Sequence, residues 1–403
     1  MSFILKILFR IFHFGMYIGA LILPFPIPKV IKGPGSVTQL PKEIRARGVR
    51  HVLIVTGNNV RKMPSFAKMT DALEQKGIRY TVFSNLQPNP TIENVENARQ
   101  AYLDAGCDGI IAFGGGSPMD CAKAAAARIV RNTSVRKLAG LFRVLVKIPP
   151  LFAVPTTAGS GSEVTIVAVI TDPERQVKLS LIDPRLVPLV AVLDPELTAG
   201  LPPAITGATG MDALTHAVEA YLAVSANART NQYAERAVEL IFKYLEKAYQ
   251  NGADMEAREQ MALASHYAGI AFTKASVGYV HAISHKLGAL YQVPHGLANA
   301  IVLPHVLESV GAKAQKKLAR LAVIGGLGLP SESDSALAAR FIDKVKTMNQ
   351  AMDIPPYVEE LKASDIAAVA ASAAREANPM YSVPCILFRP QLSDLIARLI
   401  KSA

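Results

Sequence analysis

The sequence contains few of the residues that would indicate a disulfide-stabilised or nucleic-acid-binding protein. Its 403 residues include no tryptophan and three cysteines, Cys107, Cys121 and Cys385, none of them in a C-x-x-C pair. This spacing excludes a disulfide framework and fits a reducing compartment. The formal charge is +11, but no long basic block is present. We therefore expect a solvated basic surface and no nucleic-acid partner; attraction toward anionic lipid or a phosphate-bearing cofactor is the alternative.

Residues 3–23 form an apolar segment whose polar side chains fall on one helical face. Lys6, Arg10, His13 and Tyr17 are spaced i, i+4, i+7 and i+11, and prolines then end the helix. This stripe favours a helix that lies in the plane of a membrane surface. Packing against the protein or a partner subunit is one alternative. A signal peptide or a membrane span is another, although the segment has neither a small-residue cleavage site nor an uncharged run of about 20 residues.

The rest of the chain divides into two patterns, which predict an α/β domain at 29–200 and an all-α domain at 201–403, after an apolar extension at 1–28. In the first, strands alternate with helices, which indicates a parallel sheet covered on both faces. The expected strands are 51–56, 79–83, 109–113, 152–154, 164–171 and 190–193, and the expected helices are 63–76 and 92–105. In the second, the expected helices are 208–224, 232–250, 255–274, 313–324 and 336–348.

Two loops of the α/β region have the composition of ligand-binding turns. The segment Gly114–Asp120 (GGGSPMD) links a strand to a helix, so that Ser117 is the expected N-cap and Pro118 the first helical residue. Backbone N–H groups at such a helix start attract phosphate. The segment is neither a G-x-G-x-x-G fingerprint nor a P-loop, and an ordinary turn is the alternative. The second loop, Pro155–Glu163 (PTTAGSGSE), offers small and hydroxyl side chains for a ribose or a nicotinamide.

Histidines gather in an otherwise apolar part of the helical region. Asp212 and His216 stand at i and i+4 and therefore share one helix face; His281 and His285 repeat this spacing, and His295 follows. A lone histidine in an apolar helix is usually a core residue. Four histidines with one aspartate instead favour a site for Fe²⁺, Zn²⁺ or a similar ion.

At this point the chain resembles a known family, the iron-containing (group III) alcohol dehydrogenases, to which lactaldehyde/propanediol oxidoreductase belongs. Four motifs carry the resemblance, which extends from about Val30 to the C-terminus: GGGSPMDCAKA, PTTAGSGSEVT, GMDALTHAVEAY and HAISHKLGALYQVPHGLANAI. It implies a Rossmann-like N-terminal domain and an all-α C-terminal domain, the dehydroquinate synthase-like fold, with cofactor and metal between the two. It also implies a homodimer.

The resemblance assigns roles to individual residues. The implied ligands of Fe²⁺ (or Zn²⁺) are Asp212, His216, His281 and His295. His285 resembles the histidine beside the metal, and we expect it to relay the proton of the alcohol to solvent. The expected cofactor contacts are Gly57, Asn89, Gly115, Gly116, Ser117, Asp120, Thr156, Thr157, Ser160, Thr165 and Lys178.

Three departures from the family pattern bear on specificity. Gly57 stands where many NAD-using members carry an aspartate, so a 2′-phosphate is not repelled and Arg61 or Lys62 can pair with it. We therefore expect NAD or NADP. The first 28 residues have no counterpart in the family pattern. The segment Ala377–Tyr381 keeps only part of the family motif, which predicts a different alcohol pocket.

Together these features predict a metal-dependent alcohol dehydrogenase or aldehyde reductase. It would transfer a hydride between a primary alcohol or aldehyde and NAD(P) in the cytoplasm, with peripheral membrane contact through residues 3–23 at the inner face of a membrane. One alternative is a NAD-using sugar-phosphate cyclase of the dehydroquinate synthase type. That class needs lysines and arginines around the metal, and the helix of Asp212 and His216 has few. Maleylacetate reductases lack the full ligand set. A non-enzymatic membrane-associated protein leaves the ligand set unexplained.

Overall fold

The protein folds as two compact units. The structure is a computed structural model, and it describes residues 2–22, 25–86, 88–175 and 177–401. The α/β unit comprises Pro24–Leu201 and Gly252–His266, and the helical unit comprises the remaining segments. The predicted boundaries at residues 28 and 200 assign 252–266 to the helical region and the N-terminal helix to neither domain, whereas the helical unit includes that helix.

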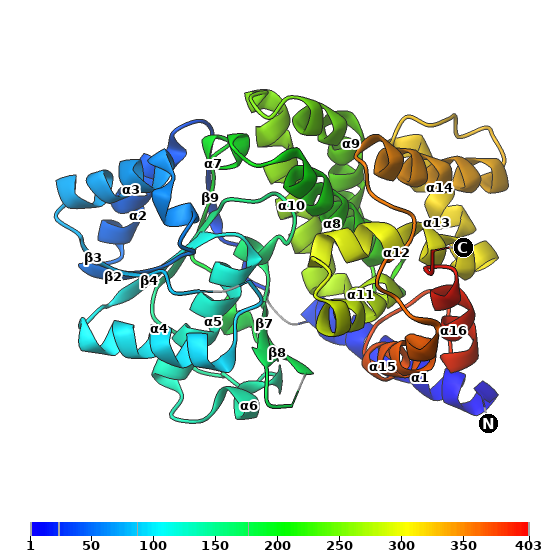
Figure 1. Cartoon of the computed structure of the whole chain (residues 1–403), viewed down its shortest axis with the longest axis horizontal. Helices are drawn as coiled ribbons and strands as arrows, with labels where there is room; N and C mark the ends of the chain where they lie inside the picture. Colours follow the sequence, from blue (N-terminus) through cyan, green and yellow to red (C-terminus); the bar gives the residue numbers. More distant parts are fainter. Residues whose placement is uncertain (1, 23–24, 87, 176, 402–403) are drawn as a thin grey trace. The chain divides into compact units, whose positions relative to one another are not determined.

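A six-stranded parallel sheet forms the centre of the α/β unit (Figure 1). Its central strands are continuous apolar runs because both faces are covered; every residue of β2, for example, is buried. In sheet order the strands are β1 (Lys29–Lys32), β9 (Val190–Leu193), β6 (Leu151–Pro155), β4 (Gly109–Gly114), β2 (His51–Val55) and β3 (Arg79–Phe83).

Helices cover both faces of this sheet, and the two-residue period of the strands decides which side chains meet which helices. Val52 and Ile54 of β2 pack with α2 (Leu40–Ala46) and α3 (Pro64–Gln75). Leu53 and Val55, which point to the opposite face, pack with α4 (Ile92–Asp104) and α5 (Gly116–Val130). Figure 1 shows the two helix pairs on opposite sides of the sheet.

A second, three-stranded sheet and short helices complete the α/β unit. Its strands are β5 (Gly140–Leu141), β8 (Val177–Ile182) and β7 (Val167–Asp172), with β7 and β8 antiparallel. The short helices are η1 (Ser36–Gln39), η2 (Val60–Lys62), α6 (Val135–Leu138), η3 (Ser162–Val164), η4 (Pro184–Leu186) and α7 (Glu196–Ala199).

The described part of the helical unit contains helices and no strand. Its helices are α1 (Ser2–Ile22), α8 (Pro203–Leu222), α9 (Ala228–Gln250), α11 (Tyr279–Tyr291), α12 (His295–Val310), η5 (Gly311–Lys313), α13 (Gln315–Ile324), α14 (Asp334–Ala351), η6 (Ala363–Asp365), α15 (Ile366–Ala377) and α16 (Arg389–Ala397). Residues of α10 (Met255–Ala275) belong to both units. The predicted fold class, an α/β domain with a parallel sheet followed by an all-α region, is confirmed.

Within the helical unit, α8 and α9 pack closely because one glycine lacks a side chain. A Cβ atom at Gly210 of α8 would lie 2.1 Å from Cδ1 of Leu245 of α9, and Leu245 is fully buried. Such contacts are far inside van der Waals distance. Gly210 therefore sets the spacing of the two helices, two residues before Asp212.

We expect Gly210→Ala to destabilise the protein by about 1–3 kcal/mol, because the new methyl group displaces a buried leucine in a packed core. Denaturant unfolding followed by circular dichroism measures the change. Gly200→Ala is the matched control, since a Cβ atom there meets no atom within 4 Å. Equal stability of the two variants would contradict this account of the α8–α9 packing.

Candidate metal centre and cofactor loops

Three helices of the helical unit bring four candidate ligands together. α8 carries Asp212 and His216 one turn apart, α11 carries His281, and α12 begins at His295. One ligand atom from each residue lies within 4.8 Å of the other three, and all but His295 are buried. The structure thus groups the same four residues that the family resemblance names.

The metal-ligand atoms of these four residues lie around one small volume. The side-chain nitrogen of Asn299 lies 2.7 Å from Oδ1 of Asp212 and 3.2 Å from Nε2 of both His281 and His295. These three ligand atoms therefore surround the same small volume. One carboxylate oxygen and three imidazole nitrogens form a donor set that Fe²⁺ and Zn²⁺ accept, so the residues fit a divalent ion.

The environment of His281 favours a neutral ring with a free lone pair. Burial, followed by the neighbouring histidines, lowers the pKa of His281 well below its usual value. Its Nδ1 lies 2.6 Å from Oε2 of Glu219. A proton on Nδ1, donated to Glu219, leaves Nε2 directed at the small volume between the ligand atoms.

Glu219 is itself held by the start of α11. Its carboxylate accepts hydrogen bonds from the backbone N–H groups of Gly278 and Val280, each at 2.8 Å. Burial raises the pKa of Glu219 to about 8, and these two N–H groups oppose that shift. Glu219 therefore ties α8 to α11 and fixes the orientation of the His281 ring.

His285 lies beside the group but has different partners. Its ring stacks on that of His295, with centroids 5.3 Å apart. Its Nδ1 lies 2.6 Å from Oε1 of Glu376, and the same oxygen accepts a hydrogen bond from the hydroxyl of Tyr381 at 2.7 Å. The ring is thus oriented through Nδ1, which leaves Nε2 as its second proton-exchanging atom.

In the α/β unit, the glycine turn between β4 and α5 differs in detail from its prediction. Gly115 is the N-cap and α5 begins at Gly116, so Ser117 lies in the first turn and is not the N-cap. The predicted assignment was wrong because the extended residue that precedes the helix is Gly115, two residues before Ser117. The backbone N–H groups at the start of the helix therefore follow Gly115. A Cβ atom at Gly115 would lie 3.2 Å from Oγ1 of Thr157.

The turn and neighbouring loops place several expected cofactor residues close together. Ser117 Oγ accepts a hydrogen bond from the backbone N–H of Asn89 (3.1 Å), and Lys178 Nζ donates to Oδ1 of Asn89 (2.6 Å). Asn89 has a left-handed backbone, with φ 59°. Gly116 faces Ser160, whose side-chain atoms would lie 3.5 Å from a Cβ at that position.

The remaining expected residues lie deeper or further along the sheet edge. Thr156 and Thr165 are buried, and Asp120 accepts a hydrogen bond from Ser162 Oγ at 3.0 Å. Gly57 follows β2, and a Cβ atom there would meet nothing within 4 Å. A larger side chain therefore fits at residue 57.

Lys123 of α5 holds the end of the second loop, Pro155–Glu163, in place. Its buried ammonium group lies within hydrogen-bond distance of Ser162 Oγ, of two oxygens of Thr165 and of the carbonyl of Val167, at 2.8–3.1 Å. Burial lowers the pKa of Lys123 to about 8, while the nearby carboxylate of Asp120 raises it. The lysine fixes the loop backbone beside Ser160.

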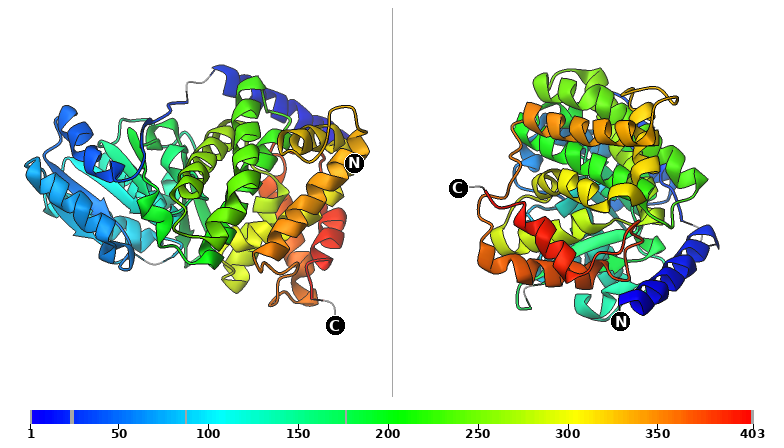
Figure 2. Two further views of the ribbon diagram at one scale, coloured as in Figure 1. Left: turned by 90° about the horizontal axis from the view of Figure 1, so that it is seen from above. Right: turned by 90° about the vertical axis from the view of Figure 1, so that its right-hand side faces the viewer.

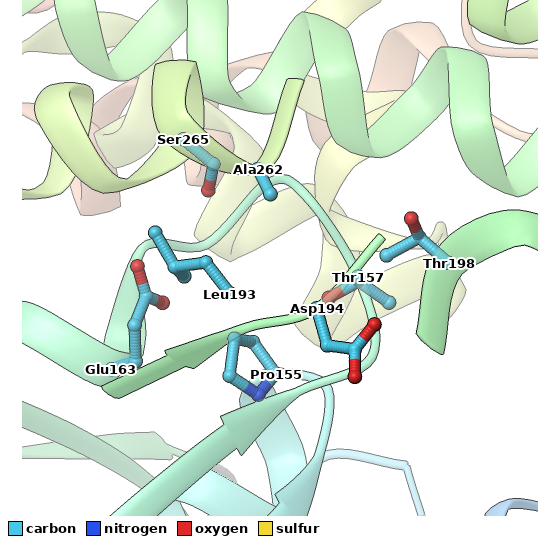
Figure 3. A pocket seen from close by; sticks show the side chains of 8 residues that line it. All are labelled: Pro155, Thr157, Glu163, Leu193, Asp194, Thr198, Ala262 and Ser265. Carbon is cyan, nitrogen blue, oxygen red and sulfur yellow. The ribbon is translucent and has the colours of Figure 1, made fainter. Parts of the chain in front are cut away.

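A cavity beneath this loop is too small for a cofactor. It is about 10 Å³, which is room for a single water molecule at most. Figure 3 shows its eight lining residues, with the carboxylates of Glu163 and Asp194 among them. Glu163 lies 3.1 Å from Nδ1 of His266, and Asp194 accepts backbone hydrogen bonds from Gly35 and Val37. These two carboxylates have internal partners.

Sequence reasoning missed Glu219, Asn299, Glu376, Tyr381 and Lys123 as supporting residues. Lys123, Glu219 and Asn299 stand within the quoted motifs, but the pattern gives them no role, and they contact Ser162, His281 and Asp212 across 39, 62 and 87 residues. Glu376 lies 91 residues from His285, and Tyr381 reaches His285 only through Glu376. Glu219 was visible as a glutamate on the same helix as Asp212 and His216, which was the only available signal.

Comparison with known proteins places the chain in a family. The model described as iron-containing alcohol dehydrogenase matches residues 27–195, and that described as Fe-containing alcohol dehydrogenase family, C-terminal, matches residues 206–400. The chain belongs to the iron-containing alcohol dehydrogenase family. The predicted family is thereby confirmed, as are the alcohol or aldehyde oxidoreductase activity and the dependence on iron and a nicotinamide cofactor. This favours the dehydrogenase over the cyclase and the non-enzymatic alternatives.

Several relatives match most of the chain. A 1,3-propanediol dehydrogenase of Klebsiella pneumoniae is 37% identical over 350 residues, which cover 86% of this chain and 90% of that protein. A lactaldehyde reductase of Escherichia coli is 37% identical over 347 residues, covering 85% and 90%. The crystal structure of a 1,3-propanediol oxidoreductase has a TM-score of 0.91 and 34% identity, covering 94% of this chain and 100% of that one.

We expect Glu219→Gln to weaken metal binding by about 10–100-fold, because the carboxylate that orients His281 is replaced by a neutral amide. Titration of the metal-free protein with Fe²⁺ or Zn²⁺ under anaerobic conditions, in competition with a chelator, measures the affinity. Glu376→Gln is the matched control, since it alters the partner of His285, which is not among the four grouped residues. Unchanged affinity in Glu219→Gln would remove this role.

Proposed function

We propose that this alcohol/aldehyde oxidoreductase binds Fe²⁺ through Asp212, His216, His281 and His295, with Zn²⁺ as a substitute ion. The observation that carries the proposal is the convergence of these four donors within 4.8 Å in a buried part of one unit. When bound, the ion supplies Lewis acidity toward the oxygen of the alcohol or aldehyde. A bound nicotinamide would supply the hydride chemistry, as acceptor in alcohol oxidation and as donor in aldehyde reduction.

The protein's own contribution is to orient groups and to accept a proton. Glu219 and Asn299 hold the ligand side chains in place. His285 accepts the alcohol proton at Nε2, while Glu376 holds the ring through Nδ1. In the direction of aldehyde reduction, the same nitrogen returns the proton.

The cofactor phosphates bind at the start of α5. The N–H groups of the first turn carry positive partial charge, and Gly115 and Gly116 allow close approach of a pyrophosphate. The further cofactor contacts we propose are Gly57, Asn89, Ser117, Asp120, Thr156, Thr157, Ser160, Thr165 and Lys178. The proposed domains remain 29–200 for the cofactor and 201–403 for the metal, after the extension at 1–28.

We also propose that the enzyme is a cytoplasmic homodimer with peripheral membrane contact through residues 3–23. Light scattering on the purified protein tests the dimer, and a monomeric mass would exclude it. Cell fractionation tests the location, and recovery outside the cytoplasmic and membrane fractions would exclude it.

The central test is reduction of NAD⁺ or NADP⁺ by a panel of alcohols, from ethanol to long aliphatic chains, after anaerobic loading with Fe²⁺. We expect His281→Ala to lose both bound metal and turnover, because it removes one of four ligands. His305→Ala is the control, since that histidine lies outside the group and contacts the carbonyl of Pro356. A metal-free but fully active His281→Ala variant would refute the site.

Cofactor choice has its own test at residue 57. We expect Gly57→Asp to shift the ratio of kcat/KM values toward NAD⁺ by roughly tenfold or more, because a carboxylate bonds the ribose diol and repels a 2′-phosphate. The open space around Gly57 admits the side chain. Asn58→Asp adds the same charge one residue further on and is the matched control. An unchanged ratio would show that residue 57 does not face the ribose.

A further inference from the structure

The N-terminal helix exposes a continuous face of large apolar side chains. The exposed fraction reaches 74% for Phe3, 63% for Ile11 and 65% for Phe14. These residues recur at helical spacing, so they share one side of α1. We call this side the outer face, and its principal members are Phe3, Ile4, Ile7, Leu8, Ile11 and Phe14. Figures 1 and 2 show α1 in blue at the outer edge of the helical unit.

The polar side of the same helix is turned toward the protein. The guanidinium group of Arg10 donates hydrogen bonds to the carbonyls of Val383 and Pro384, both at 2.7 Å. The ring of His13 is buried, and its Nε2 lies 2.9 Å from the carbonyl of Pro379. A surface helix of a globular protein usually buries its apolar stripe and exposes its polar one. α1 has the opposite orientation.

The contacts of Arg10 and His13 also fix α1 to the neighbourhood of the candidate metal centre. Both residues bond to the loop between α15 and α16. That loop carries Tyr381, whose hydroxyl bonds to Glu376, the partner of His285. The helix is therefore docked on the unit that contains the four grouped ligands, and its outer face is a fixed surface of that unit.

We propose that the outer face of α1 binds the surface of an anionic lipid bilayer, with the helix axis in the plane of the membrane. This inference specifies the membrane contact proposed above by naming the face that enters the lipid. An aliphatic and aromatic face of this length gains free energy when it leaves water for the acyl-chain boundary. In the described residues, no helix has the length and apolar character to cross a bilayer.

Charge favours an anionic lipid surface as the occupant. α1 contains no acidic residue, and its two ionised side chains, Lys6 and Arg10, border the apolar groove that Phe3, Ile7, Ile11 and Phe14 line. The whole chain carries a formal charge of +11. Anionic headgroups attract such a protein, at about 1 kcal/mol per basic residue near the surface.

A second copy of this chain is the competing occupant of the outer face, and charge argues against it. A two-fold contact would pair the same face of two helices. Lys6 and Arg10 of both copies would border that contact, with no acid on either helix to neutralise them. The test below separates this outcome from lipid binding.

The absence of tryptophan provides a clean reporter, since Phe14→Trp introduces the only indole of the chain. With vesicles of equal parts phosphatidylcholine and phosphatidylglycerol, we expect a blue shift of its emission and quenching by brominated acyl chains. Leu329→Trp is the matched control, because Leu329 is 66% exposed but lies between α13 and α14. We expect neither change in the control.

Sedimentation with the same vesicles measures the affinity. We expect the double variant Ile7→Glu and Ile11→Glu to lower the partition coefficient by at least about tenfold, because two exposed apolar groups that would enter the lipid become charged. Leu329→Glu should bind like the unmodified protein. Binding should also weaken at high salt and on vesicles of phosphatidylcholine alone. Unchanged thermal unfolding verifies that the double variant is folded.

Two results would overturn the proposal. One is the absence of vesicle binding together with an unshifted Phe14→Trp spectrum. The other is a combination of two observations: the Phe14→Trp emission is already blue-shifted without vesicles, and the molecular mass of the protein in solution falls in the double variant. This combination would identify a second copy of the chain as the occupant of the outer face. No metal, cofactor or alcohol is present in these assays, so their outcome is independent of the catalytic proposal.

Discussion

The close approach of three helices around Asp212 is the constraint on which the rest of the helical unit depends. Four ligand atoms share a space less than 5 Å across, so the backbones of α8, α11 and α12 must come together there. Gly296 permits this for α12, because a Cβ atom at that position would lie 2.5 Å from the carbonyl oxygen of Ala208 on α8. Gly210 permits the packing of α8 on α9 from the other side. Glycine is thus required where ligands must converge.

Buried polar groups then hold these helices in their relative positions. Glu219 accepts hydrogen bonds from the backbone N–H groups of Gly278 and Val280, and its Oε2 lies 2.6 Å from Nδ1 of His281. A buried carboxylate without such partners would be costly, so these bonds determine how α8 and α11 meet. In the same way, Glu376 of α15 contacts Nδ1 of His285 and orients its ring. Both pairs orient an imidazole through Nδ1 and leave Nε2 for chemistry.

Much of the fold was predictable from local pattern. The strand at Arg79–Phe83 was predicted with its observed bounds, and the helix predicted at 92–105 ends one residue earlier, at Asp104. For α4 the period suffices, because Val95, Ala98 and Tyr102 form one buried face. β3 has no buried residue, and its β-branched and aromatic composition alone predicts it. β8 (Val177–Ile182) was not predicted, because its half-exposed residues include Lys178 and Ser180 and do not form a buried run. The strand predicted at 164–171 begins only at Val167, since residues 162–164 form a 3-10 turn.

The candidate site was less accessible to local pattern. Spacing and composition grouped Asp212 with four histidines as a metal site, but only the family resemblance chose His216, His281 and His295 as ligands and set His285 apart. Glu219 was not found, because His281 lies 62 residues away in the sequence. Asn299 lies one helical turn after His295, but its contact with Asp212 spans 87 residues and no local pattern indicates it. The N-terminal helix shows the same limit in another form. Periodicity identified the stripe of Lys6, Arg10 and His13 but not the medium that each side meets. A stripe facing water and a stripe facing loop carbonyls have the same sequence pattern. Only the structure, in which Arg10 and His13 contact the carbonyls of Pro384 and Pro379, decides between them.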